Sequence, residues 1–421
     1  MTKNTNIHKL MSQIGKTAKQ AAHKLTTAST KAKNAALTVA AAALRRNKQQ
    51  IISENSKDIV DGENTGMSEA MLDRLTLDET RIDAIANGLD EIAELPDPVG
   101  IITDKWTRPN GLIFERRRTP LGVIGVIYES RPNVTADAAA LCLKAGNAAI
   151  LRGGSESFNS SCAILACLTE GLNSAGLPDT AIQHVPTRSR EAVGEMLAMA
   201  DYIDVIVPRG GKSLIERISA ESRVPLFKHL HGICHTYVTE DADPVMAEKI
   251  VLNAKMRRTG ICGATETLLI DRGALPLLKR IVDVLISAGC EIRGDSDAQN
   301  NDQRIIPANP EDWDTEYLDS IISVCTVDGL DAAVNHIAVH GSSHTEAIIT
   351  KNPAIAEAFV NNVDSAIVMV NTSTQFADGG EFGMGAEIGI STGKLHARGP
   401  VGLEQLTSMK YVVRGNGQCR P

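Results

Sequence analysis

The chain has 421 residues, 43% of them hydrophobic and 22% charged, with a formal net charge of −8. This length predicts two or three domains, and these proportions exclude general disorder. The negative net charge gives no reason to expect a nucleic-acid partner. No apolar run is long enough to span a membrane. The eight cysteines form no CxxC pair, which argues against a zinc site or a disulfide framework and favours the cytoplasm as compartment.

The first 94 residues predict helices. The helical pattern runs from about Ile7 to Glu94 and is interrupted by the turn-rich stretch 61–66. Lysines between residues 9 and 33 accompany apolar residues at helical spacing, so they are expected to form a solvated helix face and not a binding arm. After the proline-containing stretch 95–100, residues 112–118 predict a strand exposed on one side.

From Leu121 onward, strands and helices alternate. The predicted strands lie at 123–128, 148–151, 205–207, 267–270, 323–327, 347–349 and 365–370. The helices predicted between the first of them cover 135–144 and 157–173. Such alternation is typical of parallel sheets with crossover helices, so the fold class is α/β with two parallel-sheet domains.

Cys262 is the candidate nucleophile. It lies among glycines and other small residues in the segment 257–270, just before an apolar run that predicts a buried strand. Small neighbours leave a thiol accessible to substrate, and the preceding Arg257 and Arg258 favour the thiolate, which is the nucleophilic form. Taken alone, the cysteine could also be apolar filler, which is the usual role of a free cysteine.

Two glycine turns at strand ends are candidate nucleotide contacts. Arg152-Gly153-Gly154 opens a helix, which suits contact between backbone N–H groups and a phosphate or ribose. The second turn, 208–213, ends in Gly-Lys-Ser, but the first glycine of a P-loop would fall at Ile206. GxGxxG is also missing, so a nicotinamide site would have to be of another kind.

Three segments together resemble a known family. Residues 120–137, 327–349 and 394–404 are similar to the corresponding segments of the glutamate-5-semialdehyde dehydrogenases (γ-glutamyl phosphate reductases), within the aldehyde dehydrogenase superfamily. The resemblance extends from about Lys33 to Val412. It implies an aldehyde-dehydrogenase-like fold of two parallel-sheet α/β domains with a small oligomerisation hairpin.

The resemblance implies the reduction of L-glutamyl 5-phosphate by NADPH to L-glutamate 5-semialdehyde and phosphate, on the route to proline. Cys262 matches the nucleophile that forms a thioester. Asn133 matches the residue whose amide, with the backbone N–H of the nucleophile, stabilises the oxyanion, and one such donor is worth roughly 3 kcal/mol.

The same resemblance draws attention to an absence. Hydrolytic aldehyde dehydrogenases carry a water-activating glutamate about thirty residues before the cysteine, where this chain has no carboxylate between 224 and 238 and His229 falls near the matching position. Without that base the thioester is spared for hydride or phosphate. Alternate spacing of His229, His231 and His235 along one strand, with no acidic ligand nearby, favours structural roles, and no metal is expected.

Cofactor and substrate residues follow from the same match. Arg152 is expected at the adenosine ribose, where a guanidinium suits the 2′-phosphate of NADP, and Glu316 at the nicotinamide ribose. The remaining expected cofactor contacts are Gly153, Gly154, Pro208, Gly210 and Gly211. The candidate groups for the substrate carboxylate or phosphate are Arg131, Arg258, His396 and Arg398. No role is assigned to His340 or His344, although both belong to the family signature.

The resemblance also implies a domain plan and partners. An NADP-binding domain would take residues 1–259 with the return of 379–408, and a catalytic domain residues 260–378. Strands in 109–119 and 409–421 would join subunits into a homodimer or homotetramer, and glutamate kinase is a candidate partner. Two alternatives stay open: another aldehyde or acyl-phosphate dehydrogenase of this superfamily, and a non-catalytic NADP-binding scaffold.

Overall fold

The computed structural model describes residues 2–420 and divides the chain into two compact units. The first unit comprises the residues up to Lys228, Met384–Gly389 and the chain from Val401 onward. The second comprises His229–Gly383 and Ile390–Pro400. Residues 229–259 belong with the second unit, unlike the predicted division at 259/260, because the strand they contain pairs with two strands of that unit. The assignment of NADP binding and catalysis to separate domains stays a prediction.

The N-terminal helices are confirmed. They are α1 (Thr2–Leu25), α2 (Thr30–Arg46), α3 (Lys48–Asn64), α4 (Glu69–Leu75) and α5 (Glu79–Glu94). The break after α3 falls at the predicted turn, and further breaks occur where polar residues cap the next helix. Ser29 accepts from the backbone N–H of Ala32 to begin α2, and Asp78 accepts from that of Arg81 to begin α5.

The basic stretch before residue 34 is a solvated face with one exception. Lys16, Lys19, Lys24 and Lys31 are exposed, as predicted. Lys33, however, is buried, where its Nζ lies 2.6 Å from an Asp97 carboxylate oxygen and donates to the carbonyl of Lys144 at 2.9 Å. A buried ammonium is costly unless it is paired, so Asp97 makes this position tolerable. The lysine thereby links α2 to the segment that follows α5.

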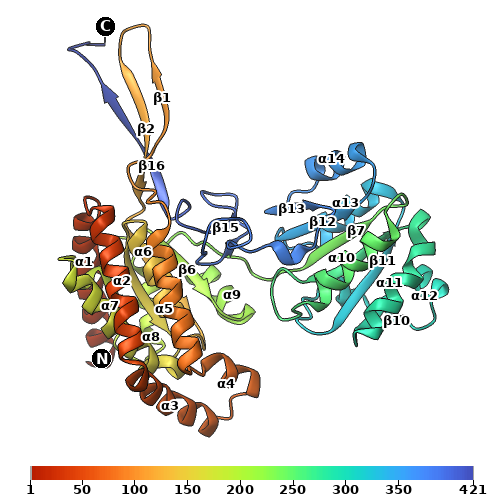
Figure 1. The fold of residues 1–421 in the computed structure, drawn as a ribbon, viewed down its shortest axis with the longest axis horizontal. Helices are drawn as coiled ribbons and strands as arrows, with labels where there is room; N and C mark the ends of the chain where they lie inside the picture. Colours follow the sequence, from red (N-terminus) through yellow and green to blue (C-terminus); the bar gives the residue numbers. More distant parts are fainter. Residues whose placement is uncertain (1, 421) are drawn as a thin grey trace. The chain divides into compact units, whose positions relative to one another are not determined.

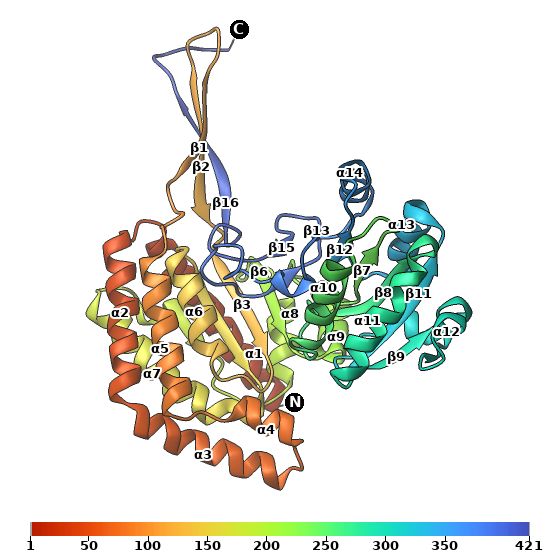
Figure 2. The same cartoon turned by 45° about the vertical axis from the view of Figure 1, so that its right-hand side comes forward.

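A four-stranded parallel sheet organises the first unit. Its order is β5 (Ile182–His184), β4 (Ala148–Gly153), β3 (Val123–Tyr128) and β6 (Val205–Arg209). The connecting helices are α6 (Val134–Lys144), α7 (Phe158–Ser174) and α8 (Glu191–Ala198), and α9 (Lys212–Glu221) follows β6. Because right-handed crossovers run outward from β3 to β5 and then return to β6, α6 and α7 cover one face and α8 the other (Figure 2). The predicted strands and helices of this unit are confirmed.

A three-stranded antiparallel sheet extends from the first unit (Figure 1). Its strands are β1 (Ile102–Thr107), β2 (Ile113–Pro120) and β16 (Thr407–Arg414), so two segments far apart in the sequence pair in one ribbon. Trp106 stacks on Phe114 at 5.5 Å and meets Tyr411 edge-on at 6.2 Å. The predicted strand at 112–118 therefore exists, and part of its aromatic face is exposed.

The second unit contains a seven-stranded, all-parallel sheet. Its order is β10 (Ile306–Pro307), β9 (Glu291–Gly294), β11 (Ile321–Val327), β8 (Thr265–Asp271), β7 (Cys234–Val238), β12 (Thr345–Ile349) and β13 (Ile367–Val370). The helices are α10 (Pro244–Met256), α11 (Leu275–Ser287), α12 (Ser296–Asn301), α13 (Gly329–His340) and α14 (Pro353–Asn362). Short strands β9 and β10 were not predicted, because two to four residues give no periodic signal.

Alternation along the central strands builds two separate cores. Leu268 and Ile270 of β8 pack with α10 and α11, whereas Leu269 between them packs on the opposite face with α13 and α14 (Figure 2). Both faces of the sheet are therefore covered, as expected for parallel strands. Within the described residues, no helix combines the length and hydropathy needed to cross a membrane.

Two helix glycines make a matched test of packing in the first unit. A Cβ on Gly171 of α7 would lie 2.1 Å from the carbonyl oxygen of Ala36, whereas a Cβ on Gly194 of α8 would meet open space. We expect Gly171→Ala to lower the free energy of unfolding by about 1–3 kcal/mol, because backbone must move. Gly194→Ala should raise it by up to about 1 kcal/mol. Denaturant unfolding compares the two, and equal effects would contradict the close contact between α2 and α7.

Candidate active site

Cys262 lies in the loop between α10 and β8. The loop closes through a hydrogen bond from the backbone N–H of Ala264 to the carbonyl of Ile261 at 3.0 Å, which leaves the thiol only partly buried. Cys142, Cys234 and Cys290, by contrast, are buried, and burial raises the pKa of each thiol, that of Cys290 to about 12. These three thiols are inert by comparison. Cys262 and Cys325 are the two partly buried cysteines of the second unit within the described residues, and burial raises the pKa of Cys325 to about 12.

A glycine fixes the position of this loop. Gly232, just before β7, comes so close to the loop that a Cβ there would lie 2.1 Å from the carbonyl oxygen of Cys262. Nearby, the Cys234 thiol donates to the same carbonyl at 3.1 Å. Only a residue without a side chain permits this approach, and it holds the nucleophile's backbone against the start of β7.

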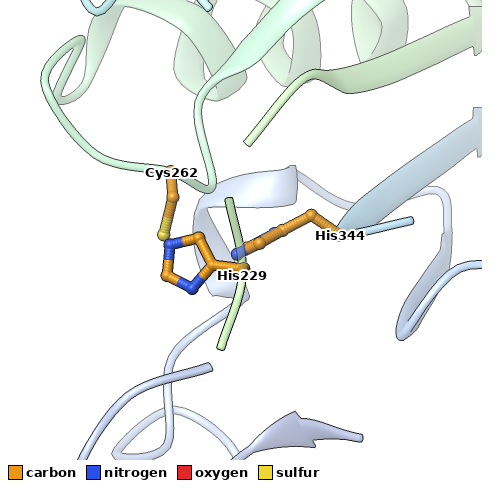
Figure 3. A group of neighbouring side chains, drawn as sticks. All are labelled: His229, Cys262 and His344. Atoms are coloured by element: carbon orange, nitrogen blue, oxygen red, sulfur yellow. The ribbon is translucent and has the colours of Figure 1, made fainter. Parts of the chain in front are cut away.

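Two imidazoles lie beside the Cys262 thiol. One ligand atom from each of His229, Cys262 and His344 lies within 4.8 Å of the other two. Figure 3 shows a ring nitrogen of His229 facing the sulfur, with the His344 ring directed to the same place. The two rings meet edge-on, their centroids 5.2 Å apart. No carboxylate of the described residues joins this group.

Hydrogen bonds orient both rings. Nδ1 of His229 donates to the carbonyl of Ile390 at 2.9 Å, so its lone pair is at Nε2. Nδ1 of His344 lies 2.9 Å from the Thr345 hydroxyl, and its Nε2 is buried with no hydrogen-bond partner among the described residues. Burial, with a contribution from His229, lowers the pKa of His344 to about 3, so this ring is neutral.

These positions revise one sequence argument. His229 and His231 precede β7 and only His235 lies in it, so the three histidines do not alternate along one strand as expected. Gly232 interrupts the strand pattern between them. His235 instead bonds the buried carboxylate of Glu346 through its backbone N–H at 2.7 Å and its ring at 3.0 Å. Sequence reasoning missed His344 as a neighbour of the thiol, and the only signal was its place in the 340–346 signature.

Glu316 is brought to the same loop. Its Oε1 accepts a hydrogen bond from the backbone N–H of Gly232 at 2.8 Å, and Gly232 is the residue that contacts Cys262. The carboxylate therefore lies at the edge of the candidate site, where the nicotinamide ribose was expected. Its role toward a cofactor stays a prediction.

One of the candidate substrate groups in the second unit, Arg398, is paired within that unit. Arg398 donates to the Asp364 carboxylate at 2.7 Å and to the backbone carbonyl of the same residue. Arg258 and His396 are exposed, and His396 adopts a positive φ of 70°. In the first unit, Arg131 is partly buried. Substrate binding by these four residues stays a prediction.

Asn133 directly precedes α6 in the first unit. Its Nδ2 donates to Asp137 one turn later at 2.9 Å. An amide nitrogen has two N–H groups, so this bond orients the side chain and leaves the second N–H for an oxyanion. The expected oxyanion role of Asn133 is thus compatible with its local geometry.

The expected cofactor residues gather at the carboxyl ends of β4 and β6. In parallel sheets, ligands bind beyond these ends where the strand order reverses, and here β6 returns to the far side of β3. Gly210 and Gly211 follow β6, and Pro208 lies within it. A Cβ on Gly210 would lie 2.5 Å from the Glu129 carboxylate, which also accepts from the backbone N–H of Gly211 at 2.9 Å.

The β4 end is equally crowded. A Cβ on Gly154 would lie 1.9 Å from a carboxylate oxygen of Glu156, and one on Gly153 would press on the Tyr128 ring. Arg152 is buried and donates to the backbone carbonyls of Arg188 and Ser189 at 3.3 Å, as well as to that of Gly153. Its Nε is buried with no hydrogen-bond partner in the described part of the chain. The absence of a side chain at Gly153, Gly154 and Gly210 is therefore required by the protein's own packing, and Arg152 retains an unused donor.

Comparison with known proteins identifies the class. The model of the aldehyde dehydrogenase family matches residues 7–289, which is well over half of the chain. The chain therefore belongs to the aldehyde dehydrogenase family.

Individual relatives are similar to this chain over nearly its whole length. A gamma-glutamyl phosphate reductase from Paramagnetospirillum magneticum is 62% identical, with 100% of each chain covered. Another from Rhodospirillum rubrum is 63% identical over 98% of this chain and 97% of its own. The crystal structure of gamma-glutamyl phosphate reductase from Thermotoga maritima matches with a TM-score of 0.96 and 40% identity, covering 98% of this chain and 100% of that chain. The family resemblance and the α/β fold predicted from the sequence are both confirmed.

The contact between Gly232 and Cys262 can be tested with a matched pair. Gly232→Ala should displace the loop and lower kcat by at least about tenfold, since small misplacements of reacting groups are costly. Gly260→Ala is the control, because a Cβ there meets nothing within 4 Å. Steady-state kinetics compare the variants with the wild type. An unchanged kcat in Gly232→Ala would contradict the claim that this contact positions the thiol.

The carboxyl group of Asp137 predicts a pH dependence of stability. Burial raises its pKa to about 6, against the opposing hydrogen bond from Asn133. The folded-state pKa exceeds the unfolded value of about 3.9, so protonation of Asp137 adds to the free energy of unfolding. This stabilisation is fully present below about pH 4 and is lost as the pH rises through about 6. The wild type should therefore lose up to about 3 kcal/mol of its free energy of unfolding over this pH range, and Asp137→Asn should not show this decrease.

Thermal unfolding of wild type and variant between pH 4 and 8 measures the difference. The exposed Asp201 gives the control variant Asp201→Asn. Parallel pH profiles for wild type and Asp137→Asn would mean that the raised pKa is wrong.

Proposed function

We propose that this protein reduces L-glutamyl 5-phosphate with NADPH to L-glutamate 5-semialdehyde and phosphate, through a thioester on Cys262. This is the second step of proline synthesis from glutamate. The observation that carries the proposal is the partly exposed thiol of Cys262, held by Gly232 and flanked by imidazoles with no carboxylate in the group. The name shared by relatives at 57–63% identity, gamma-glutamyl phosphate reductase, supports glutamyl phosphate as the substrate.

The first chemical step belongs to Cys262 and His229. The sulfur attacks the acyl carbon of the substrate, and Nε2 of His229 accepts the thiol proton. Collapse of the tetrahedral intermediate breaks the carbon–oxygen bond to phosphate, and the imidazolium returns the proton to the departing phosphate oxygen. Atoms and charge balance: acyl phosphate and thiol become thioester and hydrogen phosphate.

Two donors stabilise the oxyanion in this scheme. The backbone N–H of Cys262 supplies one, and the Asn133 amide, oriented by Asp137, supplies the other. A nicotinamide cofactor, when bound, would supply the hydride for reduction of the thioester. Cys262 then leaves as thiolate and is reprotonated, which restores the resting thiol.

The residues at the β4 and β6 ends fit a dinucleotide. The backbone of Gly153, Gly154, Gly210 and Gly211 would contact the cofactor, with the space beside Gly211 the least filled by the protein's own side chains. Glu316 lies next to the Cys262 loop for the nicotinamide ribose. Preference for NADP is supported by Arg152, whose buried Nε has an unused donor. The half-exposed guanidinium of neighbouring Arg188 adds positive charge at the same strand end. Guanidinium groups suit the doubly charged 2′-phosphate.

We also propose a homodimer or homotetramer joined through β1, β2 and β16. Trp106, Tyr411 and Val413 on this ribbon are exposed large side chains, and an unpaired edge strand invites pairing with another copy. A monomer in sedimentation analysis would contradict this.

The cytoplasm is the proposed compartment, since its reducing conditions suit a chain with eight free cysteines. Glutamate kinase is the proposed partner, because direct transfer would protect an acyl phosphate that is prone to hydrolysis.

The reverse reaction tests the proposed activity. With glutamate semialdehyde and NADP, wild-type protein should form NADPH continuously only when phosphate is present, and at most one NADPH per active site without it. Cys262→Ala should lower this rate by about three orders of magnitude or more, since the nucleophile is lost. Cys419→Ala, which removes an exposed thiol, is the control and should keep full activity.

Other results would redirect the assignment. Continuous NADPH formation without phosphate would mean that water hydrolyses the thioester, with His229 as the base that activates it. Activity with aliphatic aldehydes but none with glutamate semialdehyde would favour another dehydrogenase of the family. Full activity of Cys262→Ala would refute the thioester route.

A further inference from the structure

The atoms around the Cys262 thiol also form a donor set for a soft divalent cation. Thiolate sulfur and neutral imidazole nitrogen are the ligands that Zn²⁺ prefers in proteins. Three such atoms, from His229, Cys262 and His344, lie within 4.8 Å of one another. Ligand atoms on a tetrahedral zinc lie roughly 3.3–3.6 Å apart, so each side chain needs to move by less than about 1 Å.

An independent feature of His344 points to a ligand. Its side chain is fully buried, yet its Nε2 has no hydrogen-bond partner among the described residues. Buried polar atoms are normally satisfied, so an orphaned ring nitrogen calls for an explanation. In Figure 3 this ring is directed toward His229 and the Cys262 sulfur, which is where a cation would be held.

Both rings are already oriented as zinc ligands usually are. A metal-bound histidine almost always hydrogen-bonds through its other ring nitrogen, which fixes the tautomer. Nδ1 of His229 donates to the Ile390 carbonyl, and Nδ1 of His344 pairs with the Thr345 hydroxyl, both at 2.9 Å. His344 therefore offers its unpartnered Nε2 to the site, and His229 faces the sulfur through its other ring nitrogen.

We propose that His229, Cys262 and His344 form an inhibitory zinc site, in which Zn²⁺ binds the nucleophile and completes its coordination with water. Binding releases the thiol proton to solvent and requires no oxidant or reductant. Because the metal occupies the sulfur lone pair that attacks the substrate, zinc and substrate exclude each other. The effect on turnover rests on the proposed function, whereas the metal site itself does not.

Cobalt is the probe for this site. Metal-free full-length protein, kept reduced, is titrated with Co²⁺, and a thiolate-to-cobalt charge-transfer band with intense visible bands reports a tetrahedral sulfur-containing site. We expect one Co²⁺ per chain, displaced stoichiometrically by Zn²⁺. The band should vanish in Cys262→Ser, and affinity should fall more than about tenfold in His344→Gln and in His229→Gln.

Two variants outside the group of His229, Cys262 and His344 serve as controls. Cys419→Ala removes an exposed thiol and His340→Ala a histidine paired with Asp314, and neither should change the band. A band that survives in Cys262→Ser would overturn the proposal, as would unchanged affinity in both histidine variants with native circular dichroism. Absence of Co²⁺ binding by wild-type protein would overturn it as well.

Zinc inhibition of the reverse reaction completes the test. We expect Zn²⁺ to inhibit wild-type protein reversibly, with relief by chelator and with a weaker effect as substrate rises. If the protein binds cobalt but lacks the proposed activity, the proposed function is wrong and the metal site stands. If it is fully active but does not bind cobalt, the proposed function stands and the metal site is wrong.

Discussion

The contact between Gly232 and the backbone of Cys262 is the constraint on which the candidate site depends. Since even a methyl group at residue 232 would lie 2.1 Å from the Cys262 carbonyl oxygen, the loop and the start of β7 are held at a fixed separation. Three other features follow from it. The Gly232 N–H holds Glu316, the Cys234 thiol bonds the same carbonyl, and His229, three residues earlier, is placed beside the nucleophile.

The residues around the thiol explain how one fold serves an acyl-phosphate reductase. A carboxylate beside a thioester activates water, and no carboxylate of the described residues joins the group of His229, Cys262 and His344. In the proposed mechanism, the His229 imidazole instead moves a proton between thiol and phosphate. The lone pairs of the Cys262 sulfur and of the imidazole nitrogens are also what Zn²⁺ would bind in the proposed metal site. Reactivity and metal sensitivity would then have a common origin.

Much of the fold could be predicted from the sequence because its signals are local. Continuous apolar runs marked β3 and β8, and helical periodicity with polar caps marked α2 and α5. The buried Lys33 could not be predicted, since its partner Asp97 lies beyond three helices. His344 was missed for the same reason: its neighbour Cys262 is 82 positions earlier, and only strand order brings them together. The grouping of residues 229–259 with the second unit could not be predicted, because β7 pairs with strands that come later in the chain.

The central claim is that acyl groups pass through Cys262 to phosphate and not to water. Mass spectrometry of the protein after one turnover with glutamate semialdehyde and NADP, without phosphate, tests it most directly. The account predicts a single glutamyl adduct on the peptide that contains Cys262, which persists until phosphate is added and then disappears. NADPH formed in step with free glutamate, with no adduct at Cys262, would contradict it.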